Sequence, residues 1–152
     1  MNPIVSMYFL YTLAIVTSIL LVAVSMLHIY WGLGGLWPGK TKQDLIDRVF
    51  GKGTQFPSTF SCFFVATGLF LFSALPWIWM LRFSLELDHQ TLILLPYLLY
   101  FVSGIFFLRG VLGYLPFITK HWKPIFVKNT KRIYNPLCIF LGITFLVMMI
   151  GW

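Results

Sequence analysis

The amino-acid sequence contains a long stretch near its start, Ile4 to Ile29, that carries no charged side chain. With a rise of about 1.5 Å per residue, an α-helix over this stretch is longer than the roughly 30 Å hydrocarbon core of a bilayer. A helix also pairs its backbone polar groups internally, which lipid requires because it offers them no water. Tyr30 and Trp31 follow, and aromatic rings of this kind suit the membrane interface. The sequence therefore predicts a first spanning helix over residues 4–31.

Three further apolar stretches follow, over residues 58–81, 91–115 and 136–152. The whole chain is 59% hydrophobic and 10% charged, whereas about a quarter of the residues of a soluble domain are charged. This composition excludes a water-soluble fold, because too few polar groups exist to cover the apolar surface. We expect an all-α integral membrane protein, with residues 1–152 forming one domain of four transmembrane helices in an up-down bundle.

Prolines and polar residues set the expected limits of these helices. Pro76 lies inside the second span and should kink it, while Pro116 disfavours helix beyond the third span. Asn135 offers an N-cap and Pro136 a first-turn proline for the fourth helix. That helix would then have about 17 residues and end with the chain at Trp152, which is the lower limit of length for spanning.

The distribution of Lys and Arg predicts the orientation. The second connection carries only Arg82, and the terminal tails carry neither residue. Because basic residues collect in cytoplasmic loops, we expect the first and third connections in the cytoplasm and both termini outside. The first and third connections hold nine basic residues: Lys40, Lys42, Arg48, Lys52, Lys120, Lys123, Lys128, Lys131 and Arg132.

The first connection contains a helix signature over residues 41–50. Thr41 is a suitable N-cap, and Asp44 is placed to pair with Arg48 one turn later. The apolar residues that follow fall on one face, so we predict a short helix lying on the membrane surface. These apolar residues are Leu45, Ile46, Val49 and Phe50.

The basic residues of the third connection predict contact with anionic lipid head groups. A phosphate-bearing substrate or an acidic partner is an alternative for the same loop. The net charge of +7 does not indicate nucleic-acid binding, because the basic residues flank apolar spans and do not form one soluble face. The predicted lipid-contacting residues are Lys120, Lys123, Lys128, Lys131 and Arg132.

Arg109 lies inside the third predicted span, where a guanidinium is costly and by default marks a functional site. No Asp or Glu occurs in any of the four spans. Its partner is therefore a loop carboxylate such as Asp44 or Asp47, a backbone carbonyl, or an anionic ligand. The alternative is that Arg109 extends to the head groups as an anchor.

His28 is the histidine inside a predicted span, and Trp31 lies on the same helical face. A histidine in this position more often bonds to a neighbouring helix than binds a ligand. The topology nevertheless brings several polar side chains to a similar depth, Cys62 and Cys138 included. We therefore hypothesise one ligand-binding pocket on the cytoplasmic side, formed by His28, Trp31, Arg109, Tyr114, Tyr134 and Asn135.

Several kinds of chemistry receive little support. A metal site would need His28, Cys62, Cys138 and His121 to meet, without the close spacing typical of such sites. Haem binding would need a second intramembrane histidine as the opposite axial ligand. A thiol oxidoreductase would need paired cysteines. Proton-coupled transport usually needs an intramembrane carboxylate. No particular cofactor follows from the sequence, and no metal site is predicted.

Three sequence segments resemble a known family. They are His28-Ile-Tyr-Trp-Gly-Leu-Gly-Gly, Phe107-Leu-Arg-Gly and Tyr134-Asn-Pro-Leu-Cys. In order and spacing, over nearly the whole chain, they are similar to a small bacterial membrane-protein family of unknown function, domain-of-unknown-function family 3995. The resemblance implies a four-helix, multi-pass protein of the bacterial cytoplasmic (inner) membrane and brings no established reaction. It also implies a cytoplasmic-side position for the residues that match: His28, Trp31, Arg109, Tyr134, Asn135 and Cys138.

Three functions remain open from the sequence. The first is a non-enzymatic protein that binds a lipid-soluble or anionic small molecule, or a partner protein, at the hypothesised pocket. The second is a small membrane enzyme acting on a lipid or quinone, with His28 as acid/base and Arg109 stabilising negative charge. The third is an accessory or immunity-type subunit that recognises another membrane protein, or a homo-oligomer that uses its glycines for close helix contact.

Overall fold

The computed structural model describes residues 3–150, which are helical apart from turns and short connections and contain no strand. Four helical segments in this range are long and apolar enough to cross a membrane. The prediction of an all-α protein with four candidate spans is confirmed. The elements are α1 (Pro3–Gly32), α2 (Lys42–Val49), α3 (Thr59–Leu81), α4 (His89–Leu112), α5 (Pro116–Thr119), α6 (Pro124–Asn129), the π-helical turn η1 (Thr130–Tyr134) and α7 (Asn135–Ile150).

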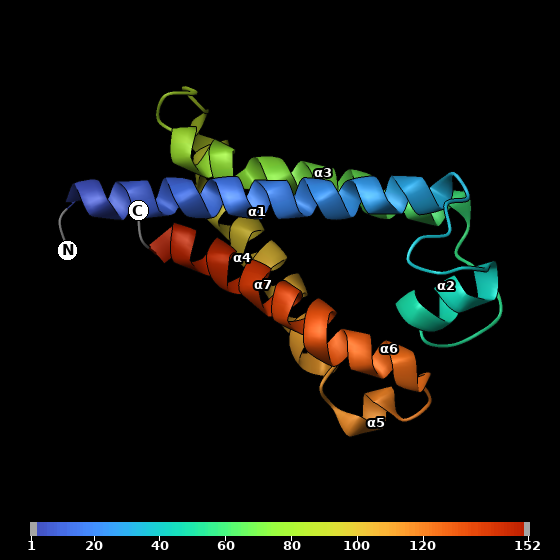
Figure 1. Cartoon of the computed structure of the whole chain (residues 1–152). Coiled ribbons are helices and arrows are strands. Elements are labelled where there is room, and N and C mark those ends of the chain that lie inside the picture. Colours follow the sequence, from blue (N-terminus) through green and yellow to red (C-terminus); the bar gives the residue numbers. More distant parts are fainter. Residues whose placement is uncertain (1–2, 151–152) are drawn as a thin grey trace.

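The long helices form two antiparallel pairs, α1 with α3 and α4 with α7. The pairs meet where α1 begins and α7 ends, which we call the closed end (Figure 1). They diverge toward the opposite end, where α1 and α4 end and α3 and α6 begin, which we call the open end. The chain thus forms two helical hairpins that are splayed apart and do not pack along their whole length as a regular bundle.

The hydrophobic core lies toward the closed end and draws on all four long helices. Two hydrogen bonds also cross between the pairs there. The Thr17 hydroxyl donates to that of Thr144 at 3.2 Å, and the indole N–H of Trp79 donates to the Met148 carbonyl at 2.9 Å. These contacts hold the hairpins together. The buried core residues are Leu10, Ala14, Leu21, Leu75, Trp79, Met80, Leu95, Leu99, Val102, Phe106, Leu141, Phe145 and Met148.

Small residues bring the two helices of each pair close together. The Ser25 hydroxyl donates to the Ala66 carbonyl at 2.8 Å within the first pair. In the second pair, the Ser103 hydroxyl donates to the Gly142 carbonyl at 2.7 Å, and a Cβ at Gly142 would lie 3.1 Å from the Phe107 nitrogen. Such contacts suit lipid, where packing and interhelical hydrogen bonds replace the hydrophobic drive for association.

The predicted start of the fourth helix at Asn135 was wrong. The helix begins at Pro124 and runs through η1 into α7, giving a span over Pro124–Ile150. Asn135 is fully buried inside it, and its backbone N–H donates to the Thr130 carbonyl. The same five-residue spacing would pair the Lys131 carbonyl with a backbone N–H at position 136, but Pro136 has none. The Tyr114 hydroxyl donates to this carbonyl instead, at 3.2 Å.

The remaining boundaries differ by small amounts. Helix α4 starts at His89, because the Asp88 carboxylate accepts the backbone N–H groups of Gln90 and Thr91, and it ends at Leu112 before the expected Tyr114 or Leu115. The Thr91 hydroxyl holds the pKa of the Asp88 carboxyl below its ordinary value. Because the fourth helix begins early, the basic residues from 128 to 132 lie on a helix and not in a loop. The predicted end at Trp152 lies outside the described residues.

Candidate functional site

A short helix, α2, forms where the sequence predicted one, and its position on the membrane surface stays a prediction. The Thr41 hydroxyl accepts the Asp44 N–H at 3.2 Å, and the Arg48 Nε donates to an Asp44 carboxylate oxygen at 2.7 Å. The Lys40 N–H donates to the other oxygen at 2.9 Å. The Lys40 backbone bond and then the Arg48 bond hold the pKa of the Asp44 carboxyl below its ordinary value. The apolar face is covered by the protein itself, since Leu45 and Ile46 are each 1% exposed.

Helix α2 connects the two pairs at the open end (Figure 1). Toward the first pair, Leu45 packs in a cluster with Trp31 of α1 and Cys62 of α3. Toward the second pair, the Arg48 carbonyl accepts the Tyr134 hydroxyl at 3.3 Å and the Asn129 amide at 3.5 Å. This short helix therefore bridges the hairpins at the end where the long helices have diverged.

The residue that follows α2 strengthens the bridge. Gly51 has φ of 74°, in the left-handed region that glycine adopts without strain. Its carbonyl accepts the Lys123 N–H at 2.7 Å. A Cβ at Gly51 would collide with the Phe126 ring, which is buried against this turn. Both the backbone angle and the close approach require glycine here.

The predicted site residues on the first pair form one local group. The His28 and Trp31 rings meet edge to face with centroids 5.1 Å apart. The His28 Nδ1 lies 2.8 Å from the Val24 carbonyl oxygen of its own helix, whereas the sequence favoured a bond to a neighbouring helix. Trp31 is buried, and its indole N–H donates to the Trp37 carbonyl at 2.7 Å. This geometry fixes the His28 ring and leaves Nε2 for other partners.

The predicted site residues on the second pair form another group around Arg109. Arg109 is exposed, and within residues 3–150 no carboxylate or carbonyl forms an ion pair or hydrogen bond with its guanidinium. Its charge acts on the Tyr134 hydroxyl and the Cys138 thiol, which lie one helical turn apart. The expected counter-ion, Asp44 or Asp47, is not paired with it. Arg109 is therefore a cation inside a candidate span that has no anionic partner among the described residues.

Asn135 and Thr130 place buried polar atoms beside this group. Both are fully buried, and neither the Asn135 amide nor the Thr130 hydroxyl has a hydrogen-bond partner among the described residues. The Asn135 amide lies against Gly113, where an added Cβ would overlap it. A buried polar group without a hydrogen-bond partner is unfavourable and calls for an explanation, such as a functional role. π-Helical turns are also frequent at functional sites. The η1 turn is thus the most unusual backbone feature near Arg109.

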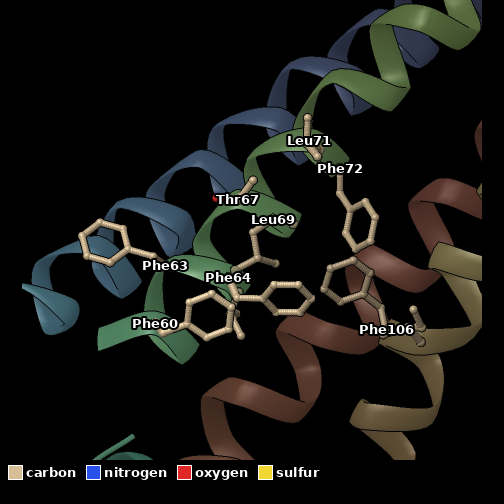
Figure 2. Close-up of a pocket in the computed structure, with 11 residues that line it drawn as sticks. Phe60, Phe63, Phe64, Thr67, Leu69, Leu71, Phe72 and Phe106 are labelled. Carbon is tan, nitrogen blue, oxygen red and sulfur yellow. The ribbon is translucent and has the colours of Figure 1, made fainter. Parts of the chain in front are cut away.

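An apolar groove of about 680 Å³ opens between α3 and α4 (Figure 2). Figure 2 shows phenylalanine rings from both helices pointing into it, among them Phe60, Phe64 and Phe106. We refer to this feature as the phenylalanine groove. These residues were not among those predicted from the sequence to form a site. The available signal was the four-residue spacing of Phe60, Phe64 and Gly68, which places two rings and a gap on one face.

The hypothesised pocket is thus divided between two walls. His28, Trp31 and Cys62 belong to the first pair, whereas Arg109 and the residues after it belong to the second. Cys62 and Cys138 are free thiols on different pairs. Within the described part of the chain, no three His, Cys, Asp or Glu side chains gather in an arrangement that could hold a metal ion. The hypothesis that one ligand contacts both groups of residues stays a prediction.

The fold defines the class: a small helical protein with four candidate membrane spans and a splayed end. Residues 21–145 match the family described as "Protein of unknown function (DUF3995)", and the chain belongs to this family. The resemblance noted in the sequence is confirmed. No curated protein and no solved structure matches the chain.

Proposed function

We propose that this protein binds a lipid-soluble molecule with an anionic group at the open end, with Arg109 as the binding cation. The observation that carries the proposal is the exposed Arg109 guanidinium, which has no protein anion within the described residues. A cation at hydrocarbon depth is unfavourable unless a partner compensates it. A ligand anion supplies that compensation, and the charge and hydrogen-bonding groups nearby suit it.

The neighbouring residues have distinct roles in this proposal. The Tyr134 hydroxyl is oriented by the Arg48 carbonyl, so α2 positions it beside the Arg109 charge. Asn135 offers an unpaired amide in the same region. Tyr114 acts on the backbone, because it supplies the hydrogen bond that Pro136 cannot. From the first pair, His28 presents its Nε2, with Trp31 holding the ring in place.

We further propose that the open end faces the cytoplasm of a bacterium and lies against anionic head groups of its inner membrane. The support is the basic residues at this end, compared with Arg82 alone in the connection at the closed end. Each of the residues that we assign to lipid contact is exposed, as a head-group contact requires. They are Lys120, Lys123, Lys128, Lys131 and Arg132.

Binding fits the geometry better than catalysis. An enzyme of the acid–base type needs a base within hydrogen-bond reach of the reacting group. The Nδ1 of His28 is already engaged with its own helix, and within residues 3–150 no hydrogen bond joins His28 to Arg109 across the two pairs. The described residues around Arg109 supply charge and hydrogen-bond donors, which favours holding a ligand over converting it.

The test compares two arginines that both lie on helices near the open end. The purified protein is heated in an uncharged detergent with and without dodecyl phosphate, an anionic amphiphile. We expect dodecyl phosphate to raise the melting temperature of the wild type and of Arg48→Gln, because a ligand that binds only the folded state stabilises it. Arg109→Gln should lose most of that increase. If Arg109→Gln keeps the full increase, the proposed function is wrong.

A further inference from the structure

We propose that Asn135 and Thr130 bind an ordered internal water inside the fourth candidate span, and that this water holds the π-helical turn η1 in place. The inference goes beyond the proposed function, because it assigns a second binding site with a different ligand. It also gives a role to Asn135, which looks like a helix N-cap in the sequence and is buried inside the helix instead.

Three buried polar atoms at this turn need partners. They are the amide oxygen and nitrogen of Asn135 and the hydroxyl oxygen of Thr130, and none has a hydrogen-bond partner among the described residues. Both residues are 0% exposed, so head groups and bulk water do not reach them. A buried amide or hydroxyl without a partner is strongly unfavourable in apolar surroundings. These atoms therefore require a small guest.

The π-helical turn places the two side chains one above the other. The Asn135 backbone N–H donates to the Thr130 carbonyl, five residues earlier. Residues joined by such a bond lie one turn apart on the same side of the helix. A helical turn rises about 5 Å, and two hydrogen bonds of about 2.8 Å to one oxygen span that separation. One water molecule is thus the right size to connect the two groups.

The mixture of donors and acceptors favours water over an ion. The Asn135 amide presents two N–H donors and an acceptor oxygen, and the Thr130 hydroxyl donates or accepts. A cation would contact the oxygens alone and would be repelled by Arg109, whose charge acts on Tyr134 in the same turn. An anion would contact the N–H and O–H groups alone. A water molecule both donates and accepts, so it satisfies both kinds of atom.

The facing part of α4 leaves the amide to such a guest. An added Cβ at Gly113 would overlap the Asn135 amide, and one at Gly110 would lie 3.1 Å from the Asn135 carbonyl oxygen. These positions have no side chain and so contribute no side-chain donor or acceptor. The next residue, Tyr114, already donates its hydroxyl to the Lys131 carbonyl.

The water matters because it fixes the register of the turn. A π-helical turn contains one residue more than an α-helical turn. An α-helical register would rotate the chain before Asn135 relative to α7 by about 100°, the angle of one residue. Tyr134 and Asn129 lie in that part and donate to the Arg48 carbonyl at 3.3 and 3.5 Å. The water therefore stabilises the bridge to α2, and it connects the buried amide to the Arg109 site without direct contact between Asn135 and a ligand.

The first measurement needs no variant. Solid-state NMR of the isotope-labelled full-length protein in phosphatidylglycerol bilayers records magnetisation transfer from water to side-chain N–H groups. We expect rapid transfer to the Asn135 amide, because a water lies against it. The matched control is the indole N–H of Trp79, which is also buried but donates to the Met148 carbonyl at 2.9 Å. Transfer to Asn135 as slow as that to Trp79 would overturn the inference.

Apolar replacements of similar shape test the same water by stability. Asn135→Leu and Thr130→Val should each lower the melting temperature by about 3 °C or more, because the remaining group loses its partner. The double variant should lose clearly less than the sum, since either change releases the shared water. Thr12→Val is the control and should change little, because Thr12 is exposed and bonds to the Tyr8 carbonyl of its own helix.

The sign and the additivity of these changes decide the result. Replacing an unpaired buried amide by an apolar group is favourable, so a higher melting temperature for Asn135→Leu would contradict a bound water. Additive losses would mean that the two side chains share no partner, which also rejects the proposal. Non-additive losses with slow water transfer would assign a direct bond between them instead. If Asn135→Leu does not fold, the water transfer in the wild type decides alone. Neither readout involves an anionic ligand, so failure here leaves the test of Arg109 unaffected.

Discussion

The two ends of the molecule place an arginine in opposite environments, buried at the closed end and exposed at the open end. At the closed end Arg82 is buried, lies 4.0 Å from the centroid of the Trp79 ring and donates to the Trp79 carbonyl at 2.5 Å. At the open end Arg109 is exposed and has neither an ion pair nor a hydrogen bond within residues 3–150. The comparison shows that the closed end pairs its cation with neighbouring groups, whereas the Arg109 cation of the open end has no such partner within residues 3–150.

The same contrast appears in the packing. The closed end joins all four long helices through one apolar core. The open end is joined by the short helix α2 and the turn at Gly51, largely through backbone carbonyls. Elements with few buried contacts open more easily than the core. Substitutions should therefore affect global stability at the closed end and local opening or binding at the open end.

The largest expected effect comes from removing a core ring at the closed end. Phe145 is fully buried and stacked on Phe106, so Phe145→Ala should lower the free energy of unfolding by about 3–5 kcal/mol. Thermal unfolding in detergent measures it. The matched control is Phe60→Ala at the open end, where the ring is 79% exposed and little stability should be lost. Equal losses at the two positions would contradict the division between the ends.

The two arginines provide the next comparison. Arg82→Leu removes a buried hydrogen bond and a ring contact and should cost about 1–2 kcal/mol. Arg109→Leu removes an uncompensated charge from a candidate span, so without ligand the melting temperature should stay the same or rise. Stability and lipid retention are measured on the same samples. A loss of stability in lipid-free Arg109→Leu as large as that in Arg82→Leu would mean that Arg109 has a structural role.

The turn after α2 should show a local effect. Gly51→Ala forces a side chain into the Phe126 ring at a positive φ, which costs about 1–3 kcal/mol where the backbone resists. We expect faster hydrogen exchange in α2 and at Tyr134, with little change in the closed-end core. Gly53→Ala is the control, because Gly53 also has positive φ but no atom within 4 Å of an added Cβ. Matching exchange in the two variants would exclude a bridging role for Gly51.

The smallest effect concerns the Asp44 carboxyl. The Lys40 and Arg48 bonds hold the pKa of this carboxyl below its ordinary value in the folded protein. The ionised carboxylate therefore stabilises the fold at pH values above the unfolded pKa, and this stabilisation is lost as pH falls through the folded pKa. Asp44→Asn should therefore lower the melting temperature slightly at about pH 6, and the difference should disappear once the pH has fallen below the folded pKa. A difference that persists at the lower pH would show that the charge of Asp44 is not its source.

The parts of the fold that depend on local sequence were predictable. Apolar length identified the four candidate spans. The Thr41 and Asp44 pattern identified α2, because helix caps and one-turn ion pairs involve near neighbours in the sequence. The start of the fourth helix was not predictable in this way. Asn135 and Pro136 look like a helix start in the sequence, and the hydroxyl that compensates the proline comes from Tyr114, in the preceding segment.

The candidate site was predictable in its residues and less so in its shape. Arg109 could be singled out because any charge in an apolar span is costly. Hydrophobicity alone does not say which apolar faces pack and which stay open, since every face of these helices is apolar. The splayed pairs and the groove lined by Phe60 and Phe64 therefore emerged only with the structure. Gly68, among the Phe residues of α3, was the sequence feature closest to a signal.

Helix α2 and the turn after it accept hydrogen bonds from the second hairpin through main-chain oxygens, those of Arg48 and Gly51. Every residue type carries the same oxygen, so exchanging the Arg48 side chain leaves that acceptor in place. The outer face of this short helix is consequently free to change its charge and shape without altering the spacing of the frame. Surface recognition and internal dimensions can vary independently in a chain of 152 residues.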